Sequence, residues 1–141
     1  MKRKGSAVWN GALKNGRGTL STESGVLKET QYSFSARFEE GAGTNPEELI
    51  GAAHAGCFSM ALAGQLNSAG LTVETIKTTA TVTLEKTADG FKISAVHLEV
   101  SAKVPGADRQ AFEKAAGDAK TGCPVSRLLN ANVTMDARLE A

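Results

Sequence analysis

The sequence lacks a strong net charge, and its composition is not that of a disordered chain. Its 16 Lys and Arg residues against 15 Asp and Glu residues leave a formal net charge of +1, which favours neither nucleic acid nor an anionic membrane as a partner. Hydrophobic residues make up 41% of the 141 residues and charged residues 22%, a balance typical of one globular domain. We therefore expect a single domain over residues 1–141 that acts on a small or uncharged partner.

The chain also lacks an uninterrupted apolar run that could cross a bilayer, which takes about 18 residues. Its basic start is followed by residues 5–10, which supply no apolar core for a signal peptide, so a cytoplasmic location is expected. Only two cysteines are present. Because a reducing compartment seldom keeps a permanent bridge, Cys57 and Cys123 are expected to be catalytic, metal-binding or incidental.

Local patterns predict strands in three parts of the chain. Asn-Gly and Ser-Gly pairs punctuate the first part as turns between antiparallel strands. In residues 32–38, apolar side chains alternate with polar ones, which predicts a strand that points Arg37 away from its apolar face. Similar alternation predicts further strands at residues 73–84, 91–104 and 133–139.

Helices are predicted between these strands, which makes the expected fold class α+β. Asn45 can cap a helix over residues 46–70, in which Glu48 can close a capping box. This helix is rich in Gly and Ala, so another helix or a symmetry mate could approach it closely. Two further helices are expected, over residues 108–120 and from residue 124.

The two cysteines differ in their predicted environments. Cys57 lies in the middle of the small-residue helix, where apolar burial disfavours a thiolate unless a cation is near. Cys123 precedes Pro124 at the start of a helix, where the helix dipole favours an anion. Electrostatics alone therefore favours Cys123 as the reactive thiol and leaves Cys57 as a core residue. A neutral cap residue is the alternative interpretation of Cys123.

His54 lies three residues before Cys57 and can share its face of the helix. This spacing allows a thiolate–imidazole pair or half of a metal site. Together with His97 and Cys123, a Cys2His2 set can be assembled. Because these residues lack the short ligand spacings typical of structural zinc, no metal is expected.

Three segments together resemble a known family. They read GTLSTESGVL at residues 18–27, GTNPEELIGAAHAGCFSMAL at residues 43–62 and AKTGCPVS at residues 119–126. These segments closely resemble the osmotically inducible protein C (OsmC) branch of the OsmC/Ohr peroxidases, and the likeness extends over essentially the whole chain. It implies an OsmC-like fold of antiparallel strands around a central helix, in an intertwined homodimer with active sites at the subunit interface.

The resemblance also implies a two-cysteine peroxidase that reduces organic hydroperoxides to alcohols in oxidative and osmotic stress defence. In it, Cys57 attacks the peroxide and Cys123 condenses with the resulting sulfenic acid, which reverses the electrostatic ranking. The family's attacking cysteine is flanked by an Arg and a Glu that match Arg37 and Glu47. Composition alone would make these a solvated cation and a carboxylate favoured by the helix dipole. Arg17 is a second candidate, because the Ohr branch takes its Arg from a more N-terminal loop.

Helix geometry adds a constraint on these roles. Glu47 and Cys57 are ten residues apart, or about 15 Å along a straight helix. Either Glu47 comes from the other subunit or the helix breaks between the two residues, for example at Gly51. Of these, we expect Arg37 and Glu47 to act across a dimer interface. A pocket walled by Phe, Met and Leu side chains would favour bulky organic hydroperoxides over hydrogen peroxide.

Two other functions stay open. One is a non-enzymatic module that binds an apolar ligand in the dimer-interface cleft, with incidental cysteines. The other is a thiol acyl-transferase that uses Cys57 and His54, for which no Asn or Asp is identifiable to orient the histidine. No cofactor is expected. The redox-active disulfide would need an external dithiol reductant, and the Ohr branch suggests a lipoyl dithiol.

Overall fold

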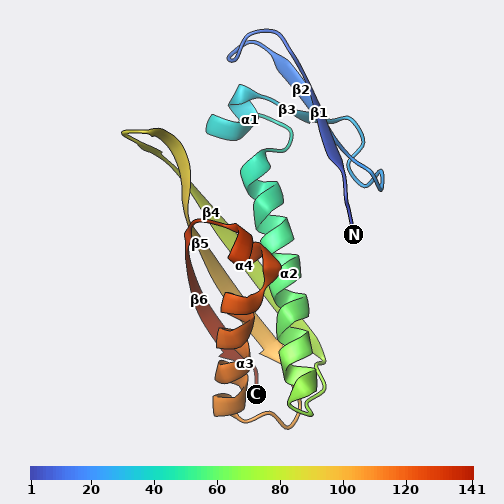
Figure 1. Cartoon of the computed structure of the whole chain (residues 1–141), viewed down its shortest axis with the longest axis vertical. Coiled ribbons are helices and arrows are strands. Elements are labelled where there is room, and N and C mark those ends of the chain that lie inside the picture. The colour runs from blue at the N-terminus through green and yellow to red at the C-terminus, as the bar shows by residue number, and fades with distance from the viewer. The chain divides into compact units, whose positions relative to one another are not determined.

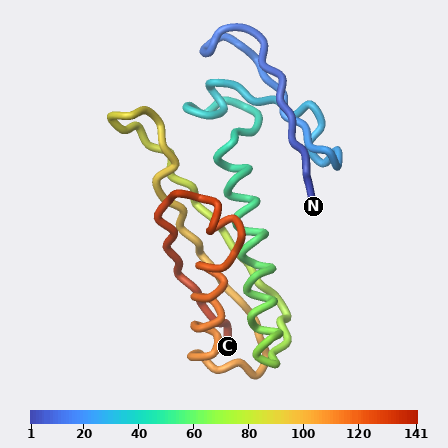
Figure 2. The backbone as a smooth tube through the Cα atoms, in the orientation of Figure 1, coloured from blue at the N-terminus to red at the C-terminus, as the bar shows by residue number.

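The structure is a computed structural model that describes all 141 residues. Its mixture of helices and strands confirms the α+β class, and the path of the chain can be followed in Figure 1 and Figure 2. The elements are β1 (Gly5–Asn10), β2 (Arg17–Thr22), β3 (Thr30–Tyr32), α1 (Phe34–Phe38), α2 (Pro46–Ser68), β4 (Thr75–Thr87), β5 (Gly90–Lys103), α3 (Arg109–Gly122), α4 (Pro124–Leu128) and β6 (Asn132–Leu139). The chain forms two compact units, residues 1–49 and residues 50–141. That both belong to one domain stays a prediction.

The first unit contains a three-stranded antiparallel sheet in which β2 lies between β1 and β3. Its two connections contain the predicted turn pairs. Gly11 and Gly25 there have φ angles of 97° and 80°, a left-handed conformation that glycine adopts without strain. The rings of Trp9 on β1 and Tyr32 on β3 pack with their centroids 5.4 Å apart.

The predicted strand over residues 32–38 is wrong beyond Tyr32, because residues 34–38 form the helix α1. Ser33 caps this helix, since its Oγ accepts a hydrogen bond from the Ala36 backbone N–H at 3.1 Å. Phe34 and Phe38 pack on each other with ring centroids 4.9 Å apart. Residues i and i+4 share a face in a strand as well as in a helix, so alternation over so short a segment does not distinguish the two.

The second unit contains a three-stranded sheet in the order β4-β5-β6. β4 and β5 form the predicted antiparallel hairpin, with a register shift between Thr83 and Leu84. β6 pairs with β5 in parallel, so the expectation of antiparallel strands is wrong for this pair. Parallel neighbours need a crossover connection, and here α3 and α4 supply it.

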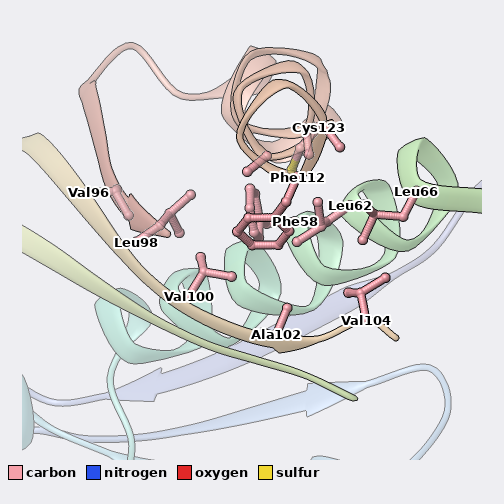
Figure 3. Packing of buried hydrophobic residues seen from close by; sticks show 13 residues of the cluster. Phe58, Leu62, Leu66, Val96, Leu98, Val100, Ala102, Val104, Phe112 and Cys123 are labelled. Atoms are coloured by element: carbon pink, nitrogen blue, oxygen red, sulfur yellow. The ribbon is translucent and has the colours of Figure 1, made fainter. Parts of the chain in front are cut away.

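The core of the second unit lies between this sheet and the helices α2 and α3, as Figure 3 shows. Alternate residues of β5 are buried there, and α2 contributes residues at i, i+4 spacing. Asp108 caps α3 as predicted, because its Oδ1 accepts a hydrogen bond from the Ala111 N–H at 2.7 Å. The main apolar members of this core are Phe58, Leu62, Leu66, Val96, Leu98, Val100, Ala102, Phe112 and Ala116.

The helix α2 begins where the sequence predicts and ends two residues before the predicted Gly70. Asn45 Oδ1 accepts a hydrogen bond from the Glu48 N–H at 2.8 Å. The Glu48 carboxylate accepts one from the Thr44 hydroxyl at 2.7 Å, rather than closing the expected capping box. Along the sheet, Gly51 allows a close approach, because a Cβ there would lie 3.1 Å from the Ala80 carbonyl oxygen.

Much of the apolar surface of α2 is not covered by this chain. By length and hydropathy alone, this helix could cross a membrane, so the expectation that no segment of the chain is long and apolar enough is wrong. The core helix of a globular domain also meets the test, and one face of α2 does fill the core. However, only 28% of the most apolar 18-residue stretch of α2 is buried. Gly56, Met60 and Gly64 are exposed on this helix.

Candidate active site

The thiols of Cys57 and Cys123 are hydrogen-bonded to each other in the second unit. Cys57 is half-buried on α2, and Cys123 is 0% exposed where α3 meets α4. Figure 3 shows the Cys123 side chain directed toward the core beside Phe112. The Cys123 thiol does not cap α4; its hydrogen bond is with the Cys57 thiol. Both are free thiols. Because they are already in contact, the second thiol is within reach to form a disulfide once the first is oxidised.

The environment of Cys57 within this unit favours the neutral thiol. Burial raises the pKa of Cys57 above its ordinary value of 9.0, and the hydrogen bond with Cys123 raises it further. A hydrogen bond from the Val125 backbone N–H acts in the opposite direction. The expectation that burial in the helix disfavours the thiolate is thus confirmed. Ionisation at neutral pH therefore needs a positive charge beside the sulfur.

Arg37 and Glu47 form an ion pair in the first unit. Arg37 Nε and Nη2 both lie 2.9 Å from Glu47 Oε1, and the guanidinium carbon lies 5.2 Å from the Phe38 ring centroid. The Glu47 side chain is 11% exposed and that of Arg37 is 39% exposed. The carboxylate therefore fixes the guanidinium while part of it stays accessible. Arg17, the other candidate, is exposed at the start of β2.

An apolar pocket of about 250 Å³ adjoins Arg37 within the first unit. Phenylalanine and leucine, two of the three residue types expected in the substrate pocket, line it, and methionine does not; that this cavity is the substrate pocket stays a prediction. Trp9 and Tyr32, which were not singled out from the sequence, complete its walls. The full lining is Trp9, Leu13, Tyr32, Ser33, Phe34, Arg37 and Phe38. A guanidinium at the edge of aromatic walls can bind a molecule with one polar end and an apolar body.

The two histidines do not join the thiols. His54 is fully buried, and its Nε2 lies 2.7 Å from Ser126 Oγ, so its hydrogen bond goes to a serine rather than to Cys57. His97 lies on the sheet face opposite the core, with Nδ1 2.6 Å from Thr134 Oγ1 and Nε2 3.1 Å from Asp136 Oδ2. No group of three His, Cys, Asp or Glu side chains that could hold a metal is present.

Comparison with known proteins places this arrangement in a family. The family model described as OsmC-like protein matches residues 39–138. Peroxiredoxin OsmC of Escherichia coli (strain K12) is 52% identical over 139 residues, which cover 99% of this chain and 97% of that protein. Organic hydroperoxide resistance protein OhrB of Bacillus subtilis (strain 168) is 31% identical over 124 residues, which cover 87% of this chain and 88% of that protein.

The solved structures agree with this assignment. An organic hydroperoxide resistance protein OsmC from Legionella pneumophila superposes with a TM-score of 0.69 at 25% identity, and the match covers 98% of this chain and 97% of that one. The fold and its paired thiols define an OsmC-like protein, and the chain belongs to this family. Within the family, its higher identity to peroxiredoxin OsmC than to OhrB supports the OsmC branch.

Proposed function

We propose that this chain is a cysteine-based peroxidase that reduces organic hydroperoxides to alcohols. The observation that carries the proposal is the hydrogen bond between the Cys57 and Cys123 thiols. The names of its relatives, a peroxiredoxin and an organic hydroperoxide resistance protein, support the same chemistry. A binding module with incidental cysteines gives no reason for the two thiols to meet.

In the proposed reaction the Cys57 thiolate attacks the terminal oxygen of the hydroperoxide. The O–O bond breaks, the alkoxide takes up a proton and leaves as the alcohol, and Cys57 becomes a sulfenic acid. The Cys123 sulfur then attacks the Cys57 sulfur, which forms the disulfide and releases water. The disulfide protects Cys57 from irreversible over-oxidation. An external dithiol, for which a lipoyl group is the proposed candidate, restores both thiols.

Arg37 is the proposed source of the charge that Cys57 needs. A guanidinium beside the sulfur favours the thiolate and stabilises the departing alkoxide. Glu47 would hold this guanidinium through its two 2.9 Å contacts. Because α2 is continuous from Pro46 to Ser68, Glu47 and Cys57 are separated by about 15 Å along its axis. We therefore assign the Arg37–Glu47 pair of one subunit to Cys57 of the other subunit in a homodimer.

The exposed face of α2 supports this homodimer. Only 28% of its most apolar window is buried within one chain, and a second subunit would remove the rest from water. Gly56 and Gly64 have no atom within 4 Å of an added Cβ, so a partner backbone could approach closely at both positions.

The pocket beside Arg37 supports an organic substrate. Its walls are mainly aromatic, and burying the alkyl part of a hydroperoxide contributes about 25 cal/mol per Å² of apolar surface. Hydrogen peroxide has no such surface, so we propose a preference for bulky hydroperoxides. A cytoplasmic location belongs to the same proposal, because the catalytic cycle needs a compartment that keeps both thiols reduced.

Mass spectrometry of peroxide-treated protein tests the proposed function. After one equivalent of tert-butyl hydroperoxide, we expect a Cys57–Cys123 disulfide within the chain. Cys123→Ser should stop at a sulfenic acid that dimedone traps, and excess peroxide should oxidise that species further. Cys57→Ser should consume no peroxide, whereas a simple binding module would keep its ligand affinity with this change. Unaltered protein that keeps two free thiols after this treatment would contradict the peroxidase assignment.

A further inference from the structure

The hydrogen bond between His54 and Ser126 has no part in the reaction described above. His54 Nε2 lies 2.7 Å from Ser126 Oγ. His54 is on α2, three residues before Cys57, and Ser126 is on α4, three residues after Cys123. The bond therefore joins the two segments that carry the two thiols.

The start of α4 meets α2 through three hydrogen bonds. The Cys123 thiol and the Val125 N–H both contact the Cys57 sulfur, and Ser126 contacts His54. The first two contacts depend on the chemical state of that sulfur, which gains an oxygen when it becomes a sulfenic acid. The third does not involve the sulfur, so it can persist while the other two are rearranged.

Packing holds α4 through its partly buried Val125 and its two cap residues, Cys123 and Leu129, which contact the core. The helix has five residues, and none of them is buried. No side chain caps its N-terminus with a hydrogen bond, and Ser126 itself is half-buried. The hydrogen bond between Ser126 and a fully buried partner on α2 adds to this apolar packing a directional contact, which fixes where α4 lies along α2.

Stability alone does not account for a histidine at position 54. The residue is 0% exposed and shares its buried helix face with Phe58 and Leu62. Its Nδ1 is buried without a hydrogen-bond partner, which is unfavourable for folding. An apolar side chain would avoid that cost, but it would also leave Ser126 without its partner on α2.

We propose that His54 and Ser126 are positioning residues that hold α4 against α2, so that Cys123 stays aligned with the sulfenic acid of Cys57. The inference rests on the proposed peroxidase function. In the step concerned, the Cys123 sulfur bonds to the Cys57 sulfur, the S–O bond breaks, and the hydroxide leaves as water with the thiol proton. This step depends on the mutual approach of two groups in one chain. A looser α4 slows it without slowing the attack on peroxide.

Ser126→Ala tests the pair by single-turnover kinetics with one equivalent of tert-butyl hydroperoxide. Quenched samples analysed by mass spectrometry give separate rates for formation of the Cys57 sulfenic acid and of the disulfide. We expect disulfide formation to slow about tenfold, while sulfenic acid formation changes less than about twofold. Under excess peroxide, more Cys57 should reach the sulfinic acid. Ser126→Thr keeps the hydroxyl in a half-buried position and should restore the rate of disulfide formation.

Thr78→Val provides the matched control. It removes a hydrogen bond of 2.8 Å between Ser59 of α2 and Thr78 of β4, which does not involve α4, and it should leave both rates unchanged. The positioning role is wrong if Ser126→Ala forms its disulfide at the unaltered rate, or if it slows both steps equally. If the unaltered protein forms no sulfenic acid, the peroxidase proposal fails instead. Disulfide formation driven by diamide then tests the positioning pair independently of peroxide.

Discussion

The Arg37–Glu47 ion pair and the Cys57–Cys123 thiol pair lie in different units of the chain, and each supplies only part of the proposed site. In residues 1–49, Arg37 is already fixed by Glu47 and adjoins an aromatic pocket, but this unit holds no sulfur nucleophile. In residues 50–141, Cys57 and Cys123 already meet, but burial raises the pKa of Cys57. The two thiols therefore meet within one unit, whereas the charge proposed to activate Cys57 comes from residues of the other unit.

The largest expected effect comes from removing the positive charge of Arg37, which is proposed to act on the thiol of Cys57. Arg37→Gln should lower kcat/KM for an alkyl hydroperoxide by about 10²- to 10³-fold, because it removes the proposed donor to the thiolate and to the leaving alkoxide. Steady-state peroxide consumption measures this loss. Arg17→Gln is the matched control and should keep nearly full activity. If Arg17→Gln causes the loss and Arg37→Gln does not, the assignment of the arginine is reversed.

Mixed dimers extend this prediction to the subunit arrangement. Arg37→Gln and Cys57→Ser subunits are each expected to be inactive alone. If Arg37 serves the partner's sulfur, a heterodimer contains one site with both residues intact, and a 1:1 mixture should regain about a quarter of full activity. No recovery after demonstrated subunit exchange would place Arg37 and Cys57 of one site in the same chain.

An intermediate effect is expected at the pocket in the first unit. Leu13 lines this pocket yet is 66% exposed, so Leu13→Ala should preserve the fold while removing apolar contact with the substrate. We expect kcat/KM to fall about fivefold for a bulky hydroperoxide and to stay unchanged for hydrogen peroxide. Val26→Ala, at an 85% exposed position outside the lining, is the control. Equal losses of kcat/KM for both peroxides would show that this pocket does not select between the substrates.

The smallest effect concerns the pH dependence of stability in the second unit. Burial lowers the pKa of His54 from its ordinary value of 6.5. Below pH 6.5 the unfolded chain therefore binds a proton that the native state excludes, so the free energy of unfolding falls as the pH decreases toward the native pKa. The slope from this group is at most about 1.4 kcal/mol per pH unit, and it vanishes above pH 6.5.

Denaturant titrations between about pH 5 and pH 7.5 measure this slope. His54→Gln should flatten it relative to the unaltered protein. His97→Gln, on the exposed face of the sheet, serves as the control. An unchanged slope in His54→Gln would mean that the buried imidazole is not the group that titrates.

The local elements of the second unit were predictable because they depend on neighbouring residues. Alternation identified β4, β5 and β6, and the Asp108 cap identified α3. The failure over residues 34–38 has a local cause, since Ser33 caps a helix too short for its periodicity to differ from that of a strand. The direction of β6 was beyond local patterns, because it depends on how the crossover packs.

For the candidate site, the sequence by itself determined the residue types, and its family resemblance predicts four site residues, Arg37, Glu47, Cys57 and Cys123. The resemblance also predicted that the two thiols meet and that Arg37 acts with Glu47, and the structure shows both contacts. Only the tertiary structure decided that His54 meets Ser126 rather than Cys57. The physical reason is that helix and strand periodicity encodes the direction of a side chain relative to its own element. Contacts between distant residues follow from how the elements pack around a shared core.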